Sequence, residues 1–459
     1  MDLKGKKVVV IGLGKSGESA VKLLLSRGAE VLILEKKEEH ELNPRMVEEV
    51  KKLGAELVTG TQSPEFVKGK DLVVVSPGVP KEVYSGFSKF CPVIGELELA
   101  WELLESKPQT VAITGTNGKT TTTAMVSEIL KTSGYRVFTG GNYGIPLSEL
   151  VLRGTKVDRI VLEVSSFQLE TIKEFSPNVG ILLNITPDHL ERYESEKEYA
   201  EYKYRMFENQ KEEDKAVLYC NLPYFEEFKE KVKGKVYTFG ECGGEARLIG
   251  ENRFSLKPGQ GEEVYSFDGF KLLGLHNKLN YLAASLAARL LGASPSAVQK
   301  LVREFTGFPH RMEFVAEVGG VYFVNDSKAT NVDATLQALK SSVPPVILIM
   351  GGRHKGAGYT SLIPYLGEKV KLLILMGEAR WIIGEQIGGV VETLYAKNLD
   401  EAVLLAIKRA QSGDTVLLSP GCSSFDEFNS YEERGQRFRE LVWKYAPKVL
   451  EEKGERVWH

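Results

Sequence analysis

Short, uninterrupted apolar runs recur along the chain, and three of them end in a glycine-rich turn that precedes a segment of helical length. These runs and their turns are residues 6–11 before 12–17, residues 110–113 before 114–120, and residues 346–350 before 351–356. A continuous run of β-branched and other apolar residues is typical of a buried strand in a parallel sheet. A glycine-rich turn after such a strand lets the backbone approach a ligand closely. The pattern therefore predicts three strand–loop–helix units with a ligand-binding turn in each.

More apolar runs of this kind follow each unit, and helical segments such as 18–27 and 121–132 separate them. The further strands are expected at residues 31–34, 72–75, 160–164, 179–185, 321–324, 372–376 and 415–418. Alternating strands and helices predict an α/β protein with doubly wound parallel sheets. Proline-containing junctions at residues 106–108 and 307–309 predict three domains, 1–106, 107–308 and 309–459. We interpret residues 240–270, rich in glycine and charge, as hairpins or loops.

The composition argues against several classes of protein. The formal net charge of -3 argues against a protein that coats nucleic acid. The four cysteines contain no C-x-x-C pair, so we expect buried thiols in a reducing cytosol, with no disulfide framework and no zinc site. The apolar run near the start is too short for a signal peptide, and no run approaches the roughly 20 apolar residues of a membrane span. We therefore expect a cytoplasmic protein without a membrane partner.

The stretch Gly115-Thr116-Asn117-Gly118-Lys119-Thr120 is the most informative in the chain. Its glycines allow backbone N–H groups to converge on phosphate oxygens at the start of a helix. Lys119 is expected to neutralise the β- and γ-phosphates, and the Thr120 hydroxyl to bind Mg²⁺. The general motif has glycine where this chain has Ile113, so the loop is a short variant. A turn with an incidental lysine is the alternative, but the order strand, G-K-T, helix favours a phosphate loop.

Two further side chains stand at the ends of neighbouring expected strands. Glu163 lies near the end of 160–164, and His189 follows 179–185. A carboxylate and an imidazole at adjacent strand ends can hold a cation against a triphosphate. The alternative for His189 is a loop histidine bonded to backbone. Lys203 lies in a helical pattern, and its sequence neighbourhood alone favours an exposed helix lysine.

The N-terminal turn carries Gly12-x-Gly14-x-x-Gly17, and Glu35 follows 18 residues after the last glycine. This is a Rossmann-like dinucleotide fingerprint, which specifies a pyrophosphate beside the glycines and a ribose-like hydroxyl beside the acid. An NAD-dependent oxidoreductase is therefore one alternative, and a UDP-bearing substrate is another. The second phosphate loop and the lack of an evident hydride-transfer site favour UDP.

The run Gly115-Thr116-Asn117-Gly118-Lys119-Thr120-Thr121-Thr122 resembles the nucleotide loop of the Mur ligases and the related folylpolyglutamate synthetases. The resemblance extends in order through nearly the whole chain. It implies a Rossmann-like N-terminal domain, a central P-loop ATPase-like parallel sheet and a Rossmann-like C-terminal domain. It also implies that ATP drives amide formation through an acyl phosphate, with two Mg²⁺ ions and a CO₂-derived carbamate on Lys203.

The resemblance assigns roles along the chain. The expected catalytic residues are Lys119, Glu163, His189 and Lys203, and the expected metal ligands are Thr120, Glu163, His189 and Lys203. ATP is expected to contact Gly115, Thr116, Asn117, Gly118, Lys119, Thr120, Thr121, Asn277, Asn280, Arg311, Asp326 and Lys328. The UDP substrate is expected at Gly12, Leu13, Gly14, Lys15, Ser16, Glu35, Ser76, Gly78, Asn142, Ser165 and Gln168. A D-glutamate pocket is expected at Thr330, Lys355, Ser424 and Phe425.

The run Ser165-Ser166-Phe167-Gln168-Leu169-Glu170 and the Rossmann-like first domain favour the family member that adds D-glutamate to UDP-N-acetylmuramoyl-L-alanine in peptidoglycan precursor synthesis. The L-alanine-adding member, with a similar first domain, is the nearer rival. A nucleotide-binding regulatory or transport-coupled ATPase without ligase activity is the alternative from another class. A ligase would release phosphate only when an amino-acid acceptor is present, and this dependence would distinguish it from an ATPase without ligase activity. We expect a monomer whose partners are small molecules, with no nucleic acid.

Overall fold

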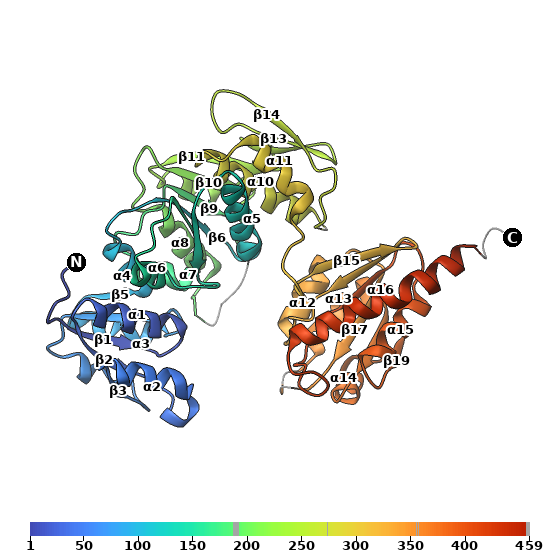
Figure 1. Ribbon diagram of the computed structural model, residues 1–459, viewed down its shortest axis with the longest axis horizontal. Helices are drawn as coiled ribbons and strands as arrows, with labels where there is room; N and C mark the ends of the chain where they lie inside the picture. The colour runs from blue at the N-terminus through green and yellow to red at the C-terminus, as the bar shows by residue number, and fades with distance from the viewer. Residues whose placement is uncertain (187–191, 273, 355, 357, 456–459) are drawn as a thin grey trace. The chain divides into compact units, whose positions relative to one another are not determined.

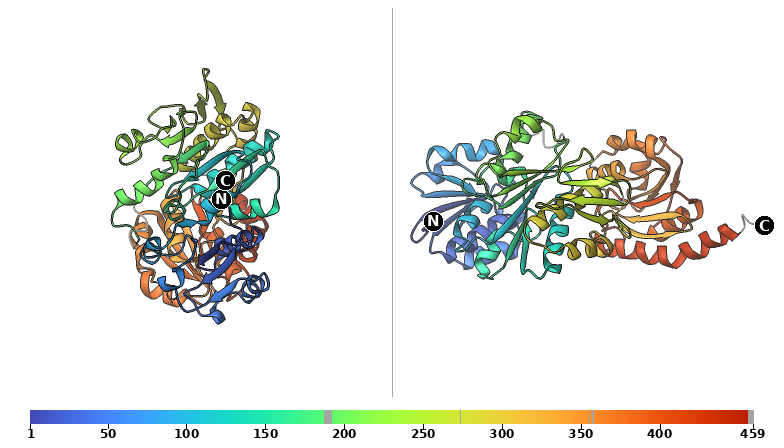
Figure 2. Two further views of the ribbon diagram at one scale, coloured as in Figure 1. Left: turned by 90° about the vertical axis from the view of Figure 1, so that its left-hand side faces the viewer. Right: turned by 90° about the horizontal axis from the view of Figure 1, so that it is seen from above.

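The structure is a computed structural model that describes residues 1–186, 192–272, 274–354, 356 and 358–455. The chain divides into two compact units (Figures 1 and 2). The first unit comprises residues 1–269 and 279–303, and the second comprises 270–278 and 304–459. Within the described residues three β-sheets form, two in the first unit and one in the second, in agreement with the predicted α/β fold. The predicted domain boundaries at 106/107 and 308/309 stay predictions.

The first sheet is parallel and carries the N-terminal glycine turn. Its strands, in order across the sheet, are β3 (Glu56–Val58), β2 (Glu30–Leu34), β1 (Lys7–Ile11), β4 (Leu72–Val75) and β5 (Val93–Gly95). Its helices are α1 (Lys15–Ser26), α2 (Pro44–Lys52), α3 (Lys81–Ser85) and α4 (Glu96–Leu103), with short 3₁₀ turns at Glu39–Glu41, Pro64–Val67 and Phe87–Lys89. Val8 and Val10 enter one apolar cluster while Val9 and Ile11 enter another, so both faces of β1 are covered. That is why its sequence is a continuous apolar run.

The second sheet carries the phosphate loop at its centre. Its order is β14 (Glu263–Ser266), β13 (Arg253–Leu256), β12 (Ala246–Ile249), β11 (Lys235–Gly240), β10 (Lys215–Tyr219), β9 (Val179–Leu182), β6 (Gln109–Thr114), β8 (Arg159–Glu163) and β7 (Val137–Gly141). The associated helices are α5 (Lys119–Thr132), α6 (Leu147–Arg153), α7 (Ser166–Leu169), α8 (Glu196–Tyr204), α9 (Phe225–Lys229), α10 (Leu275–Leu290) and α11 (Pro295–Glu304), with a 3₁₀ turn at Arg205–Phe207. β6 is flanked by β8 and β9, so the ends of all three strands meet at one edge.

Residues 240–270 extend this sheet with the antiparallel strands β12, β13 and β14, which confirms the predicted hairpins. The cysteine prediction was wrong at one point: Cys220 and Cys242 form a disulfide, with Cα atoms 6.3 Å apart. The two residues are distant in sequence, but they follow the paired strands β10 and β11, which bring them together. Cys91 and Cys422 are buried and take no part in a disulfide, as expected.

Helix α4 joins the two sheets of the first unit through two buried carboxylates. Glu96 accepts hydrogen bonds from the backbone N–H (2.7 Å) and the hydroxyl of Ser148. Glu98 accepts backbone N–H groups from three successive residues, 173–175, at 2.8–3.1 Å. Burial raises the pKa of both carboxyl groups, and these donors oppose the rise. The helix that follows β5 is thus fixed to the element carrying Ser148 and to the segment after α7.

The third sheet forms the second unit. Its order is β15 (Glu313–Val318), β16 (Val321–Asn325), β20 (Thr415–Leu418), β17 (Val346–Gly351), β18 (Val370–Met376) and β19 (Thr393–Tyr395), and β15 is antiparallel to its neighbour. Its helices are α12 (Val332–Ser341), α13 (Ile363–Lys369), α14 (Arg380–Ile387), α15 (Leu399–Arg409) and α16 (Tyr431–Glu455), with a 3₁₀ turn at Thr360–Leu362. Of the helices in the described part of the chain, none has the length and apolar content needed to cross a membrane.

Candidate active site

The phosphate loop connects β6 to α5 and depends on two glycines with positive φ. Gly115 has φ of 151° and Gly118, which caps α5, has φ of 83°. A Cβ atom on Gly118 would lie 2.5 Å from Oδ1 of Asn280 on α10, so a side chain there would displace the Asn280 amide group. Asn280, predicted to contact ATP, is therefore packed directly against the loop. The glycine pattern serves both the backbone conformation and this close approach.

Lys119 is the first residue of α5 and folds back over the loop. Its Nζ donates to the carbonyl oxygens of Gly115 and Thr116, at 2.8 Å each. The ammonium group is thus held over the residues predicted to surround the phosphates. A cation at the N-terminus of a helix adds to the positive end of the helix dipole, which favours a bound anion.

Asn184, just beyond β9, holds the other side of the loop, a contact that our sequence reasoning missed. Its Oδ1 accepts the backbone N–H of Asn117 at 2.8 Å, and its Nδ2 donates to the Asn117 carbonyl at 3.0 Å. The Asn184 carbonyl accepts the N–H of Thr116 at 3.0 Å. A polar residue directly after a central strand is the signal that could have indicated this role.

Glu163 ends β8 beside the loop, in register with Ile113 of β6. The side chain is buried, with 3% of its surface exposed. Its Oε1 accepts from Nδ2 of Asn142 at 2.9 Å, whereas its buried Oε2 has no hydrogen-bond partner. A buried carboxylate oxygen without a partner costs free energy, and a cation would satisfy it. This geometry fits a metal ligand.

Glu163 has few protein partners for a metal among the described residues. His189 lies outside the described residues. Among the residues that are described, no group of three or more His, Cys, Asp and Glu side chains is arranged to hold a metal ion. Besides the predicted ligand His189, a metal at Glu163 would draw on ligands of other kinds, such as the Thr120 hydroxyl, phosphate oxygens or a modified lysine.

Lys203, near the end of α8, is buried, so the exposed lysine that its sequence neighbourhood favoured is wrong. Its Nζ donates to the carbonyl of Gly115 at 3.0 Å and lies 4.4 Å from the ring centre of Tyr199. The Tyr199 hydroxyl is 3.3 Å from Oγ1 of Thr116. Helix α8 therefore brings the lysine to the phosphate loop, a long-range contact that local periodicity cannot reveal.

The residues predicted to bind the substrate near Glu163 are engaged in local structure. Ser165 caps α7: its Oγ accepts from the Gln168 backbone N–H at 3.2 Å, and its own N–H donates to Oε1 of Gln168 at 3.0 Å. This reciprocal capping box fixes the start of the helix. Asn142 donates its N–H to the Glu163 carbonyl at 2.8 Å. Their predicted substrate contacts stay predictions.

The N-terminal glycine turn is shaped by close backbone contacts. Gly12 has φ of 87°, and a Cβ atom on Gly17 would lie 2.0 Å from the Gly12 carbonyl oxygen. Ser76, after β4, donates its hydroxyl to that same oxygen at 2.9 Å. A Cβ atom on Gly78, by contrast, would meet no heavy atom within 4 Å. The first and third glycines of the fingerprint are thus required by geometry.

Glu35, at the end of β2, holds this turn from the other side. Its Oε2 accepts the N–H of Leu13 at 2.7 Å, and its Oε1 accepts the N–H of Lys37 at 3.0 Å. Lys15 and Ser16 open helix α1, whose N-cap is Gly14, and the Lys15 ammonium donates to the Gly144 carbonyl. The predicted UDP residues around this turn therefore lie together, and Glu35 acts on the backbone of the turn itself.

In the second unit, the ends of β16, β20 and β17 bring three predicted segments together. The Gly421 N–H donates to the Ala329 carbonyl at 2.9 Å, and Arg353 and Ser423 exchange backbone hydrogen bonds at 2.9 and 3.2 Å. Buried Arg434 of α16 donates to the Ser327 and Cys422 carbonyls at 2.9 and 3.1 Å. Sequence reasoning missed this arginine, which sits in an ordinary helical pattern. Ligands bind at such carboxyl ends of parallel strands.

Asp326 lies at the centre of this region and is almost fully buried. Its Oδ1 accepts the N–H of Met312 at 3.1 Å, and its Oδ2 accepts the hydroxyl of Ser419 at 2.8 Å. Burial raises the pKa of Asp326 to about 7, although both donors act against the rise. This carboxyl group therefore titrates near neutral pH, unlike an ordinary aspartate.

The remaining predicted residues of the second unit that the structure describes are exposed or partly exposed, apart from Ser424. Arg311 lies between His310 and Met312, which have φ of 62° and 42°. Positive φ at residues other than glycine is strained and is found often at functional sites. Lys328 and Thr330 are partly exposed in the turn after β16, Asn277 lies in the first turn of α10, and Phe425 is 60% exposed. Lys355 lies outside the described residues.

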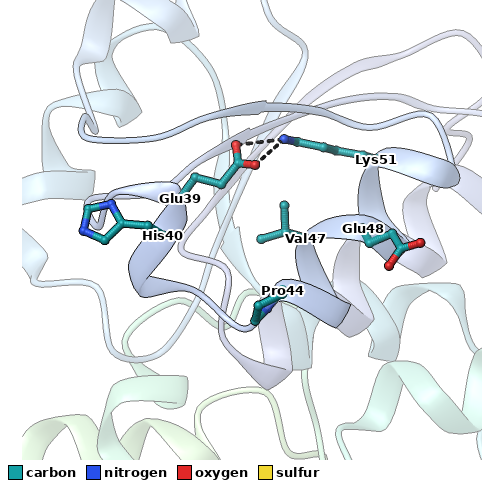
Figure 3. Close-up of a pocket in the computed structure, with 6 residues that line it drawn as sticks. All are labelled: Glu39, His40, Pro44, Val47, Glu48 and Lys51. Atoms are coloured by element: carbon teal, nitrogen blue, oxygen red, sulfur yellow. Dashed lines mark hydrogen bonds and ion pairs between the residues drawn. The ribbon is translucent and has the colours of Figure 1, made fainter.

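A separate cavity of about 540 Å³ lies on the N-terminal part of the first unit (Figure 3). It is lined by Glu39, His40, Pro44, Val47, Glu48 and Lys51. The Glu39 carboxylate and the Lys51 ammonium form an ion pair at 2.7 Å, and both side chains are about half exposed. The cavity contains none of the residues that the sequence predicted for a site.

Curated relatives match the chain over nearly its full length. A UDP-N-acetylmuramoylalanine--D-glutamate ligase from Geotalea daltonii is 42% identical over 454 residues, covering 96% of this chain and 98% of the relative. The protein of the same name from Caldanaerobacter subterraneus is 41% identical, covering 96% and 99%. The chain belongs to the Mur ligase family. Residues 6–85 match the Mur ligase MurD-like N-terminal domain, residues 113–288 the Mur ligase middle domain, and residues 310–422 the Mur ligase glutamate ligase domain.

Solved structures of a Mur ligase and of a pseudomurein peptide ligase share the fold. The MurF ligase from Thermotoga maritima in complex with ADP is 18% identical with a TM-score of 0.54, covering 98% of this chain and 96% of that one. A pseudomurein peptide ligase type C from Methanothermus fervidus is 21% identical with a TM-score of 0.54, covering 96% and 100%. The three predominantly parallel sheets of this chain are thus the Mur ligase architecture.

Proposed function

We propose that this Mur ligase uses ATP to join D-glutamate to UDP-N-acetylmuramoyl-L-alanine, a step of peptidoglycan precursor synthesis. The proposal rests on sequence identity of about 40%, along 96% of the chain, to ligases named for this reaction. The geometry supports it: a phosphate loop, a buried acid with a free oxygen and a buried lysine lie at one edge of the central sheet.

In the first step, the terminal carboxylate of the sugar nucleotide attacks the γ-phosphorus of ATP, which forms an acyl phosphate and releases ADP. Two anions meet in this step, so the main task of the protein is to stabilise negative charge. We assign this task to Lys119 and the N-terminus of α5. Support comes from the Lys119 ammonium group, which lies over the loop carbonyls. Backbone N–H groups of the loop and of the start of α5 would hold the phosphates, apart from those of Thr116 and Asn117, which donate to Asn184. Asn280 packs against the loop.

Mg²⁺ would be held by Glu163, whose Oε2 has no hydrogen-bond partner, together with Thr120, His189 and carboxylated Lys203. When bound, the cations supply charge neutralisation at the transferring phosphoryl group. We expect two such ions.

Lys203 is proposed to react with CO₂ through its neutral amine: an N–C bond forms, one proton is lost and a carbamate anion results. A carbamate can bind a cation that an ammonium group would repel. Burial favours this chemistry, because desolvation disfavours the charged ammonium form. The side chain is 1% exposed, and its Nζ is 3.0 Å from the carbonyl of a loop residue.

In the second step, the amine of D-glutamate attacks the acyl carbon, and phosphate leaves from the tetrahedral intermediate. Thr330, Lys355, Ser424 and Phe425 are proposed to hold this acceptor. Support comes from the backbone hydrogen bonds that join the segments bearing these residues at the ends of β16, β17 and β20. An acceptor with two carboxylates requires cations and N–H donors, which Lys355 and the turn backbone would supply.

The other substrate contacts are also proposals. The N-terminal turn would hold the UDP pyrophosphate, with Ser76, Gly78 and Glu35 around it, while Asn142, Ser165 and Gln168 would contact the sugar nucleotide nearer the phosphate loop. Arg311, Asp326, Lys328 and Asn277 would contact ATP. We place the enzyme in the cytoplasm because its proposed substrates, ATP and a nucleotide sugar, are found there. We propose a monomer, since one chain supplies every residue named.

The decisive experiment measures ADP and phosphate release with UDP-N-acetylmuramoyl-L-alanine and each of D-glutamate, L-glutamate, L-alanine and meso-diaminopimelate. D-glutamate should support turnover, and L-glutamate should be at least about 100-fold poorer because its amine is misplaced when both carboxylates are bound. Turnover with L-alanine and unsubstituted UDP-N-acetylmuramic acid would assign the chain to the L-alanine-adding member. Phosphate release without any acceptor dependence would refute the ligase proposal.

A further inference from the structure

A buried carboxylate that is not among the predicted site residues connects several parts of the first unit. Glu170 directly follows α7, and its side chain is 1% exposed. Its two oxygens accept four hydrogen bonds: Tyr84 Oη (2.5 Å), Tyr193 Oη (2.8 Å), Arg192 Nε (2.8 Å) and Arg192 Nη2 (2.7 Å). Such a fully satisfied buried network specifies one arrangement of the groups that it joins.

The donors come from separate segments of the chain. Tyr84 is on α3 of the N-terminal sheet, and Arg192 also donates to the Val79 carbonyl at 3.0 Å, in the loop before α3. Arg192 further lies 4.2 Å from the ring centre of Phe167, in the helix that Ser165 and Gln168 cap. Burial and the neighbouring carboxylate raise the pKa of Tyr84, so its hydroxyl stays a donor.

The backbone around Glu170 extends the same connection toward the phosphate loop. Arg205 donates to the carbonyls of Leu169, Glu170 and Ile172 at 2.7–2.9 Å. Arg205 directly follows α8, two residues after Lys203, whose Nζ reaches the Gly115 carbonyl. Residues 169–172 are therefore bound to helix α3 beside the N-terminal sheet through Glu170 and Tyr84, and to the end of α8, which bears Lys203, through Arg205.

We propose that Glu170 is a positioning residue that sets the spacing between the N-terminal turn and the phosphate loop. This inference rests on the proposed function, in which the sugar nucleotide spans that spacing: its pyrophosphate lies at the turn, and its carboxylate meets the γ-phosphate at the loop. An error of about 1 Å in the placement of reacting groups costs on the order of 100-fold in rate. The hydrogen bonds of the Glu170 carboxylate all come from other protein side chains, so we assign its effect to alignment.

The test compares Glu170→Gln and Tyr84→Phe with the wild type. Glutamine keeps the shape of the side chain but presents an NH₂ group to donors, which leaves the Arg192 guanidinium or a tyrosine hydroxyl without an acceptor. Tyr84→Phe removes a single hydrogen bond to the N-terminal sheet and guards against misfolding of the first variant. Turnover, ADP binding and UDP binding are measured for each protein, the last two by calorimetry.

Glu198→Gln is the matched control. Glu198 on α8 pairs with Lys81 on α3 at 3.2 Å, so it also joins the N-terminal sheet to the central part of the unit. That pair is partly exposed, and exposed pairs contribute little. Glu198→Gln should therefore keep wild-type turnover.

We expect Glu170→Gln to lower kcat at least about tenfold, and Tyr84→Phe to lower it by a smaller factor, through misalignment of the bound reactants. The Kd values for ADP alone and UDP alone should stay unchanged, since each half of the site is intact. Wild-type kcat in both variants would overturn the proposal. Parallel loss of ADP and UDP binding with kcat would also overturn it, because that result means a structural role. Failure of the proposed function would instead appear in the wild type, as absence of D-glutamate-dependent phosphate release.

Discussion

The buried Asp326 carboxyl group makes a quantitative prediction about pH and stability. Its pKa is raised to about 7 in the folded protein, mainly by burial, whereas an exposed aspartate titrates near 3.8. The folded state therefore holds a proton that the unfolded state has already lost between these values. A raised carboxyl pKa costs stability as pH rises through that window, and the cost levels off above pH 7. At 1.36 kcal/mol for each pKa unit, the full cost is about 4 kcal/mol.

Asp326→Asn removes this titration and keeps the shape of the side chain. Its amide oxygen can accept the Met312 N–H, and its NH₂ group can donate to the Ser419 hydroxyl. Between pH 5 and pH 8, the wild type should lose about 3 kcal/mol of unfolding free energy relative to the variant, because most of the window between the two pKa values lies in that interval.

Urea unfolding of both proteins at pH 5, 6, 7 and 8 measures this difference, and the other ionisable groups cancel in the comparison. Trp381 and Trp443 belong to the second unit, where Asp326 lies, and Trp101 belongs to the first. Fluorescence therefore follows both units, and the difference between the two proteins isolates the effect at Asp326. Parallel pH profiles for the two proteins would refute the reasoning, since they would mean that the folded carboxyl group titrates at its ordinary pKa.

Three further predictions follow from the first unit. Lys119→Ala should lower kcat by at least about 100-fold through loss of charge stabilisation, with UDP binding retained; calorimetry showing equal loss of UDP affinity would count against it. Lys203→Ala should abolish most turnover, acetate should restore part of it, and depletion of CO₂ should slow the wild type; a near-native rate in the variant would exclude the carbamate. Thiol titration of the denatured protein without reductant should find two reactive cysteines rather than four, because Cys220 and Cys242 are paired.

The fold was largely predictable because buried parallel strands have a clear sequence pattern. Strands β1, β6 and β17 are covered on both faces, so they are continuous apolar runs, and the glycines after them mark the turns. The phosphate loop was equally clear, since a G-K-T run between a strand and a helix is typical of a phosphate-binding turn. Glu163 could be assigned to the same edge because its strand precedes a polar segment.

The contacts between distant segments could not be predicted. Helix α8 has no strong apolar face, so the burial of Lys203 depends on where the fold places it. The hydrogen bonds of Glu170 also depend on the fold, because their donors lie on separate segments. The disulfide depends on the pairing of β10 with β11. The raised pKa of Asp326 reflects burial at a strand end, and a polar sequence neighbourhood gives no sign of it.

Helix α4 has a practical consequence for dividing the protein into fragments. A fragment that ends at residue 106 would keep Glu96 and Glu98 but lose every N–H and hydroxyl group that solvates them, since those donors belong to residues 148 and 173–175. Its last helix would carry two carboxylates on an apolar surface. A fragment that ends at Gly95 would avoid this. If the protein were divided at that point and helix α4 left out, the backbone N–H groups of residues 148 and 173–175 would lose their acceptors, the carboxylates of Glu96 and Glu98. The N-terminal sheet is therefore best studied with the central sheet attached.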